Sequence, residues 1–564
     1  MLCALTIRST VAEDPPPGGN TEPPYGQPLC GAVPVEGTPV FTGAMGWAKY
    51  AFHNPPQNYN PNTWYEVTHP GDYLPGVETP IQHTLRYAIE QLTGPRNIKV
   101  LVNGTIKLKS RLSMDDQSYV KITGEYATGI GPTVTGDEFR IKDCNNIVLR
   151  YLRFRSAEDP TSYHCARSLL ILGEDEGCND IIVDHCSIGA SRDDNISVYG
   201  KLCRVTVQNC IIGGGVMSIS KAGIGSGGLA SNEHERLTYC RNLITNTKER
   251  QLHFSGHGRV DFFNNVVSIN KWAIELASDN GTDSPKINII NNQFETANAW
   301  TRGTYFEDPI RARIINAPTN PPTSYSAHLP KSTNEHSIFV SGNRYRRYNP
   351  VESQYEEPYL LEDFPQWAMT YDFNNNAGHS NPLPGETDFP TVLAKSTAFD
   401  MPSDTILDTE DVKDHVLANA GCRLPVSGQV LDEHDKDLVD AAEVGDRLYK
   451  EDEGDNNGFP GTPILVSPAD EATGVSTTVT LSWAASDETN CYLIAFGTLN
   501  PPSINHACQV SDPCCATPTQ CCTPDTEFEL SGLQPNTTYY WQVYAKNPCS
   551  IVPSANVRSF TTGS

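Results

Sequence analysis

Basic residues are few in this chain of 564 residues, which has 41 Lys and Arg against 67 Asp and Glu and a formal net charge of −26. This balance excludes a general nucleic-acid-binding protein, because such proteins need many cations to neutralise phosphates. A polyanion could still bind, but only through a local basic groove or through bridging cations.

Long apolar runs are also missing, so we expect no membrane span. The opening MLCALTIRST lacks the full hydrophobic region of a signal peptide and is either a remnant of one or simply the start of the chain. Hydrophobic content is 38%, and the 43 Gly and 42 Pro indicate a turn-rich chain rather than a helical one.

Cysteines are sparse except near the end, where seven of the 17 lie within residues 491–564. This density in a short segment predicts disulfides and an oxidising, extracellular setting, so we expect a secreted protein. The spacing does not determine the pairing, and a set of free thiols is the alternative.

Composition divides the chain into four parts. Residues 1–40 are rich in Pro and Gly and are interpreted as a flexible N-terminal segment, and residues 41–450 form the large domain. Residues 451–462 are an acidic linker, and residues 463–564 form a second, small domain.

The large domain contains a repeated strand pattern of eight residues with apolar first and third positions. Its sixth position is Leu or Cys in the first three copies and Asn in the last four. The seven copies are IVLRYLRF (from Ile147), IIVDHCSI (Ile181), VTVQNCII (Val205), LTYCRNLI (Leu237), VDFFNNVV (Val260), INIINNQF (Ile287) and IFVSGNRY (Ile338). Stacked coils of a parallel β-helix would place these Asn side chains above one another, where buried amides can form a hydrogen-bonded ladder. A β-sandwich or a propeller does not require Asn at one fixed position.

Two helices are predicted beside the repeats. Residues 83–92 carry apolar residues on one face and could cover the open end of the solenoid. The segment from Val412 has a second helical face, and Gly421 is a signal for its C-terminal end.

The small domain has alternating strands, an early Trp483 and the motif Leu-x-Pro-x-Thr-x-Tyr ending at Tyr539. These features are typical of a small β-sandwich, and the segment resembles a fibronectin type III domain.

The large domain resembles polysaccharide lyase family 1, the pectate lyases, in its bacterial secreted form. The resemblance rests on GAMGWAKYA, HTLRYAI, NIVLRYLRFR, IIVDHCSIGAS, the segment beginning at Arg250, and ANAGCRLP, in this order over some 400 residues. It implies an all-β fold, a right-handed parallel β-helix, with cleavage of an acidic, uronate-containing polysaccharide by β-elimination.

The resemblance assigns the catalytic base to Arg250. The family's next Pro and second Arg are replaced here by Leu252 and Ser255, so His253 or His257 is expected to bind the substrate instead. Lys221 and Arg192 are further expected substrate-binding residues.

A calcium site is implied by the same resemblance, because hard cations prefer several oxygen ligands. Asp193 matches one ligand position, Asp194 is a candidate substitute, and the other two positions carry Ser168 and Ser197. Asp184 and His185 match a family motif that is expected to order the coil near the site.

Further basic residues on the same coils are expected to line one groove and give it a positive potential on an acidic protein. They are Arg150, Arg153, Arg155, Arg167, Lys248 and Arg259.

Two functions therefore stay open. The first is a secreted lyase acting on a uronate polymer, with polygalacturonate (pectate) as the expected substrate. The second is a non-catalytic β-helix that binds a glycan or assembles as a surface or filament protein. In either case the small domain could serve for cell-surface or matrix attachment or for self-assembly.

Overall fold

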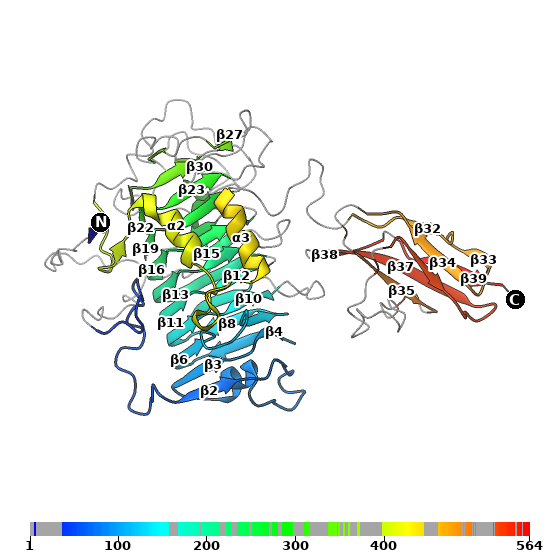
Figure 1. Cartoon of the computed structure of the whole chain (residues 1–564), viewed down its shortest axis with the longest axis horizontal. Coiled ribbons are helices and arrows are strands. Elements are labelled where there is room, and N and C mark those ends of the chain that lie inside the picture. The colour runs from blue at the N-terminus through cyan, green and yellow to red at the C-terminus, as the bar shows by residue number, and fades with distance from the viewer. Residues whose placement is uncertain are drawn as a thin grey trace. The chain divides into compact units, whose positions relative to one another are not determined.

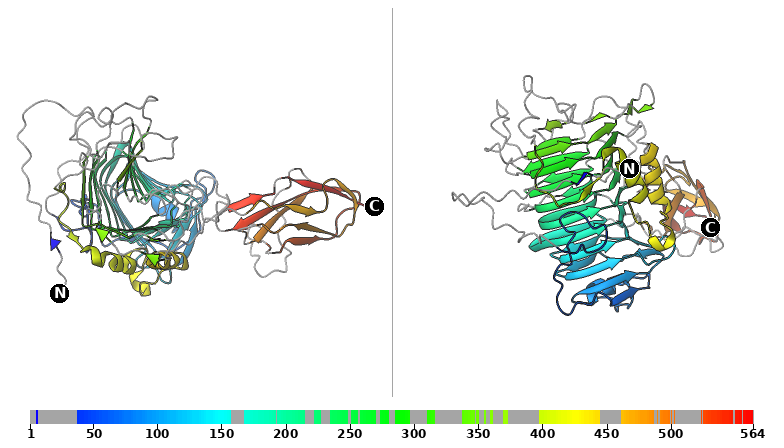
Figure 2. Two further views of the ribbon diagram at one scale, coloured as in Figure 1. Left: turned by 90° about the horizontal axis from the view of Figure 1, so that it is seen from above. Right: turned by 60° about the vertical axis from the view of Figure 1, so that its left-hand side comes forward.

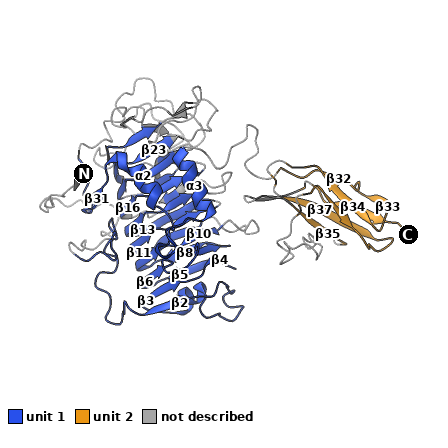
Figure 3. Cartoon of the chain, viewed as in Figure 1, with its two compact units in different colours: residues 1–157, 164–448 blue, residues 158–163, 449–564 orange. Residues whose placement is uncertain are grey.

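The computed structural model describes residues 5–6, 37–156, 167–191, 193–214, 222–226, 234–247, 251–255, 258–269, 273–279, 285–296, 310–315, 337–346, 348–349, 354–355, 359–360, 369–372, 397–444, 461–486, 489, 491–498, 500, 502, 523, 525–547, 550–554 and 556–563. The chain divides into two compact units, a larger one within residues 1–448 and a smaller one that contains residues 449–564 (Figure 3). No helix in the described part of the chain is long and apolar enough to cross a membrane.

The larger unit is a right-handed parallel β-helix, with its coils stacked in chain order (Figure 1). The repeats predicted the parallel coils, and the family resemblance implied their right hand. Each coil contributes one strand to each of three parallel sheets, here named A, B and C, and the long strands β11 and β13 run from sheet A into sheet B. Sheet A contains β5 (Leu112–Asp115), β8 (Phe139–Lys142), the first part of β11 (Leu169–Asp184), the first part of β13 (Asp194–Gln208), β15 (Ala222–Ser226), β18 (Leu252–Ser255), β21 (Ile274–Asp279), β24 (Ile310–Ile315) and β30 (Met369–Asp372).

Sheets B and C follow sheet A in each complete coil from β5 onward. Sheet B contains β2 (Trp64–Val67), β3 (Arg96–Val100), β6 (Ser118–Thr123), β9 (Asn145–Arg150), the second parts of β11 and β13, β16 (His234–Cys240), β19 (Gly258–Phe263), β22 (Pro285–Ile290) and β25 (Ser337–Ser341). Sheet C contains β4 (Gly104–Lys107), β7 (Pro132–Thr135), β10 (Arg153–Arg155), β12 (Ser187–Gly189), β14 (Ile211–Gly213), β17 (Leu243–Thr245), β20 (Val266–Ile269), β23 (Gln293–Thr296) and β26 (Arg344–Arg346), with β29 (Tyr359–Leu360) antiparallel at its end.

The repeat register is confirmed in every copy. Ile147 pairs with Ile181, and the pairing continues through the first residues of the later copies to Ile338. The first and third residues of each copy point into the core, because strand side chains alternate between the two faces. The long spacing before Ile338 therefore does not change the register of the repeat.

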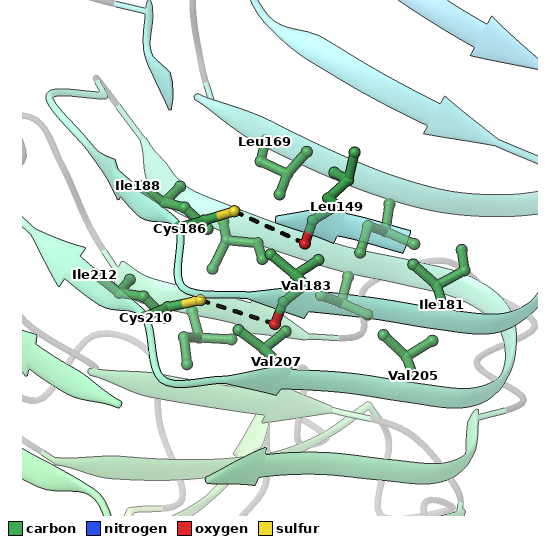
Figure 4. Close-up of a cluster of buried hydrophobic side chains, with 14 of the residues drawn as sticks. Leu149, Leu169, Ile181, Val183, Cys186, Ile188, Val205, Val207, Cys210 and Ile212 are labelled. Carbon is green, nitrogen blue, oxygen red and sulfur yellow. Dashed lines mark hydrogen bonds between the residues drawn. The ribbon is translucent and has the colours of Figure 1, made fainter. Parts of the chain in front are cut away.

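The sixth position forms the predicted ladder. The side-chain oxygen of Asn265 accepts hydrogen bonds from the backbone N–H (3.0 Å) and Nδ2 (3.1 Å) of Asn242, and Asn292 receives the same pair from Asn265. Asn343 accepts the last pair, from Asn292. In the preceding coils the position is occupied by Cys186 and Cys210, whose sulfurs lie above one another in the core (Figure 4). Inside a solenoid, the Asn ladder satisfies backbone groups at the corner between sheets B and C.

The residue before the ladder position makes the corner itself. It has a positive φ in every copy, from 48° at Asn291 to 66° at Gly342. Asn and Gly tolerate this left-handed conformation best, and three of the seven copies have Asn there. The repeat pattern predicts the ladder but not this turn.

The predicted N-terminal helix is shorter than expected. Helical residues extend from 85 to 91, with the π-helix η1 at Tyr87–Gln91, and His83 has a φ of 62°, which excludes it from a right-handed helix. Leu85, Ala88 and Ile89 pack on the core of the solenoid, so the segment covers its first coils as predicted.

Sheets B and C are covered on their outer faces. Residues 40–52 lie over sheet B, where Ala48 and Ala51 pack against Val148 and Ile182. Helices α2 (Thr409–Asn419) and α3 (Glu433–Val444) lie across sheet C (Figures 1 and 2). The second predicted helix is thus confirmed, and Gly421, just after it, has a φ of 91°.

The smaller unit packs two sheets around a core that includes Trp483, Trp541 and Phe560. One sheet has the order β32 (Leu465–Ser467), β34 (Val479–Trp483) and β36 (Glu527–Leu530). The other has the order β33 (Ala472–Val475), β39 (Arg558–Thr562), β37 (Thr538–Asn547) and β35 (Cys491–Gly497), with β38 (Ser550–Pro553) paired to β37. The Tyr539 hydroxyl accepts a hydrogen bond from the Gln534 N–H at 3.0 Å, which anchors the turn before β37.

Six cysteines of the solenoid are buried free thiols, Cys144, Cys178, Cys186, Cys210, Cys240 and Cys422. The seven cysteine side chains of residues 491–564 fall outside the described part, so the disulfides expected there stay a prediction.

Candidate active site

Four of the expected site residues lie outside the described residues: Arg192, Lys221, Arg250 and His257. Asp193, Asp194 and His253 are described and belong to sheet A or the residue just before its strand β13. The outer face of sheet A around these residues is therefore the candidate site.

One outward row crosses sheet A in register. Leu170 pairs with Ser197, Ser197 with Gly225, and Gly225 with His253. The neighbouring inward row is apolar throughout, because it faces the core. This alternation places His253, which is half-buried, on the same face as Ser197 with only a glycine between them.

Asp194 occupies the space that this glycine leaves. A Cβ atom added to Gly225 would lie 2.0 Å from Asp194 Oδ2, so the carboxylate sits directly over β15. Ser197 Oγ and Tyr199 Oη each donate a hydrogen bond to the same oxygen at 2.8 Å. Asp194 is only 5% exposed, so this carboxylate acts by holding neighbouring groups rather than by meeting solvent.

Tyr199 links the carboxylate to a cation. Burial raises the pKa of its hydroxyl, and the charge and hydrogen bond of Asp194 raise it further, so the phenol stays protonated and remains a donor. The Arg167 guanidinium lies 5.4 Å from the centre of the Tyr199 ring. Tyr199 was not singled out from the sequence, although its outward position in β13 could have suggested it.

The backbone next to Arg250 is well fixed. Gln251 is fully buried, and its Nε2 donates a hydrogen bond to the Ser268 carbonyl in β20 at 3.0 Å. Leu252 is buried in the core and pairs with Ile224.

The Asp184–His185 pair lies elsewhere than expected. The sequence placed it near the site, but Asp184 is in the sheet B part of β11, whereas His253 is in sheet A. Burial alone would raise the pKa of Asp184, but His185 (2.8 Å), Arg150 (2.8 Å) and Asn209 (3.0 Å) outweigh it and hold the pKa well below its usual range. This carboxylate orders the corner between sheets B and C.

The expected groove of basic residues is not formed by most of its members. Arg153 and Arg155 lie on sheet C and are buried in ion pairs with Asp432 and Asp435 beside and within α3, at 2.7 to 3.3 Å. The reason is that α3 covers sheet C, and a buried guanidinium needs anionic partners. Arg150 and Arg259 lie on sheet B, and Lys248 is outside the described residues. Among the described members of the group, only Arg167 lies at sheet A.

Comparison with known proteins gives one consistent similarity. A protein of Aspergillus terreus called probable pectate lyase C is 29% identical over 273 residues, which cover 47% of this chain and 58% of that protein. Proteins of the same name from Aspergillus flavus and Aspergillus fumigatus are 29% identical over 300 residues and 32% identical over 216, covering 51% and 37% of this chain and 64% and 47% of theirs. The larger unit is similar to fungal pectate lyases. No family model matches the chain.

Solved structures show weaker likeness. The cedar pollen allergen jun a 1 is 16% identical with a TM-score of 0.41, and covers 64% of this chain and 88% of its own. A pectate lyase from Paenibacillus is 10% identical with a TM-score of 0.41, over 70% of this chain and 98% of its own. The fold assignment rests on the strand pairing above rather than on these scores. The chain spans about half to two thirds of the length of the curated relatives it matches.

The residues at the expected calcium positions do not fit calcium well. Ser168 Oγ donates to the Gly189 carbonyl at 2.6 Å, and Ser197 Oγ donates to Asp194, so neither hydroxyl is directed at a cation. No group of three or more Asp, Glu, His or Cys side chains that could hold a metal ion occurs in the described part of the chain. Two carboxylates, Asp193 and the already hydrogen-bonded Asp194, together with two neutral hydroxyls are a weak donor set for a hard cation.

Proposed function

We propose that this chain is a secreted polysaccharide lyase that cleaves a uronate polymer, with pectate (polygalacturonate) as the expected substrate. The observation that carries the proposal is the polar outer face of sheet A, where Asp194, Gly225 and His253 lie on adjacent strands beside the chain position of Arg250. The similarity of the same unit to fungal pectate lyases supports the reaction class.

The chemistry is β-elimination. A base removes the weakly acidic proton next to the uronate carboxylate, a double bond forms, and the glycosidic oxygen leaves from the neighbouring carbon with a proton. The site must therefore hold a base close to that proton and must stabilise the charge that develops on the carboxylate.

Arg250 is the proposed base. A guanidine can accept a proton only in its neutral form, which is scarce near neutral pH, so we expect the rate to rise toward alkaline pH. His253 and His257 are proposed to bind the uronate carboxylate together with Arg192 and Lys221. Asp194 is proposed to position cationic side chains around the substrate. No step is assigned to calcium, although its addition is one arm of the test.

Ultraviolet absorbance of the unsaturated product tests the proposal directly. The protein is incubated with polygalacturonate and with other uronans, with and without calcium. Arg250→Ala should abolish the absorbance gain, whereas Arg259→Ala, at a half-buried arginine of sheet B, should retain it. Activity in Arg250→Ala would refute the base, and no gain on any uronan would refute the lyase.

A non-catalytic glycan-binding β-helix is the second candidate. It is favoured by the serines at two expected ligand positions and by Leu252 and Ser255 where the family has Pro and Arg. An inactive protein that still binds polygalacturonate would support this alternative.

The smaller unit is proposed to be a fibronectin type III-like module for attachment or self-assembly. Its two-sheet core and the Tyr539 hydrogen bond to Gln534 support this proposal. The boundaries 41–450, 451–462 and 463–564 are proposed for the two domains and their linker.

A further inference from the structure

A cluster of aromatic rings and lysines lies on sheet B, away from the candidate active site. Trp64 begins β2, Lys99 is in β3, Lys121 is in β6, and Tyr126 follows β6 in the same coil. We call Trp64, Lys99, Lys121 and Tyr126 the aromatic–lysine patch. Strand pairing places it on the first coils of the solenoid, because Trp64 pairs with Asn97 and Asn97 with Lys121 (Figure 1).

The four side chains contact one another closely. The Trp64 and Tyr126 rings meet edge to face, with 5.9 Å between their centres and 73° between their planes. Lys99 Nζ lies 5.1 Å from the Trp64 ring centre and 4.5 Å from that of Tyr126, and Lys121 Nζ lies 5.9 Å from Trp64. Tyr126 is 44% exposed, which is high for a large aromatic side chain.

The patch carries two ammonium groups, and the carboxylate of Glu125 lies near one of them, Lys121. Among the described residues, no carboxylate forms an ion pair with Lys99 or Lys121, although Glu66 lies beside Lys99 in register. Glu125 is 3.1 Å from Arg150 and also hydrogen-bonds Tyr126. Burial lowers the pKa of Lys121 and the charge of Arg150 lowers it further, whereas the charge of Glu125 raises it. On a chain of net charge −26, such a local excess of cations is unusual.

Most of sheet B has no such free surface. Val148 and Ile182 on its outer face are buried beneath residues 40–52, and Asn97 is held by Tyr59 Oη and by the carbonyls of Asn60 and Thr63. The covering segment does not bury the side chains of the aromatic–lysine patch, which remain at least partly exposed.

We propose that the aromatic–lysine patch is a second binding site for an acidic polysaccharide. An aromatic face gives the C–H side of a pyranose ring an apolar surface, and the two ammonium groups match uronate carboxylates. The choice of a uronate polymer rests on the proposed function, but the site is on a different sheet from His253 and needs no catalysis. It would retain the polymer between cleavage events.

Binding and cleavage must be measured separately to test this site. Retention on immobilised polygalacturonate reports polymer binding, and the initial rate on trigalacturonate reports the sheet A site with a ligand too short to reach both sheets. We expect Lys99→Gln/Lys121→Gln to weaken polymer retention about fivefold or more, since each half-buried cation contributes modestly. The rate on trigalacturonate should not change. Tyr126→Ala, at an exposed position, should weaken retention as well.

Lys109→Gln is the matched control, because Lys109 is an exposed lysine on another surface, paired with Glu78 at 2.8 Å. It should bind as the wild type does. Unchanged retention in the double variant, with thermal unfolding as in the wild type, would overturn the site. An equal loss of binding to neutral dextran would overturn its preference for acidic chains. If the wild type cleaves nothing yet the double variant loses retention, the lyase fails and this site stands.

Discussion

The indole Nε1 of Trp47 donates a hydrogen bond of 2.8 Å to the buried carboxyl of Asp261, across 214 residues of sequence. Asn288 Nδ2 donates to the other oxygen at 2.8 Å. This contact is one of several by which residues 45–49 are held on the outer face of sheet B. Others join the backbone N–H of Met45 to Gln208 and that of Gly46 to Asp404.

Stability should fall between acidic and neutral pH because of Asp261. Burial raises its pKa to about 7, against the hydrogen bonds from Asn288 and Trp47, which lower it. The folded protein therefore keeps a proton that the unfolded chain, with a pKa of about 3.9, releases. The free energy of unfolding should decrease by up to about 1.4 kcal/mol per pH unit from about pH 4 to 7.

Urea unfolding of the larger unit at pH 5 and at pH 8 checks this dependence. Asp261→Asn should remove most of it, whereas Asp175→Asn, at an exposed position, should leave it in place. Equal pH dependence in the wild type and in Asp261→Asn would contradict the assignment.

Removing one member of the Asn ladder should destabilise the solenoid strongly. In Asn292→Ala the N–H of Asn265 and the Phe262 carbonyl lose the Asn292 side chain as a partner inside the core, whereas Asn265 Nδ2 keeps the Tyr239 carbonyl. Each buried unsatisfied group costs about 1–3 kcal/mol, so we expect a loss of at least about 2 kcal/mol. Chemical denaturation measures the loss, with the exposed Asn62→Ala as control. A change below about 1 kcal/mol would show that the ladder is dispensable.

The buried Asp184 should stabilise the protein only above its unfolded pKa. Its folded pKa lies below the unfolded value of about 3.9, so the contribution is present above about pH 4 and is lost as the pH falls further. Asp184→Ala leaves Arg150 without this partner and should cost about 3–5 kcal/mol at pH 7. Asp115→Ala, at an exposed pair with Arg140, should cost about 1 kcal/mol or less. Similar losses in both variants, measured by denaturation at pH 7, would argue against the special role of Asp184.

Activity should depend on residue 225 being a glycine, which has no side chain. A methyl group there would meet Asp194 Oδ2 and force the carboxylate off Ser197 and Tyr199. We expect Gly225→Ala to lower kcat on polygalacturonate about tenfold or more, because one displaced group costs a few kcal/mol of positioning. Gly497→Ala, where nothing lies near the added methyl group, is the control. If Gly225→Ala keeps the wild-type kcat, the position of the Asp194 carboxylate is not needed for activity.

The coil pattern could be predicted because strand alternation and coil stacking are local rules. Apolar residues at the first and third positions and Asn at the sixth determine both the register and the ladder from Asn242 to Asn343. The buried ion pairs of Arg153 and Arg155 could not be predicted in this way. Their partners, Asp432 and Asp435, lie some 280 residues away and reach sheet C only because α3 packs there.

The candidate site was likewise predicted only in part from the sequence. Asp194 and His253 were predicted as site residues, and their strands do lie on one sheet. Tyr199 and Gly225 carry no motif, and their importance appears only when the Asp194 carboxylate is seen to cross β15. The sequence by itself determined the solenoid, its register and the expected reaction class. The tertiary structure alone decided how the outer faces of sheets B and C are covered, because covering a sheet depends on segments distant in the chain, such as residues 40–52 and α3, whose packing no local pattern encodes.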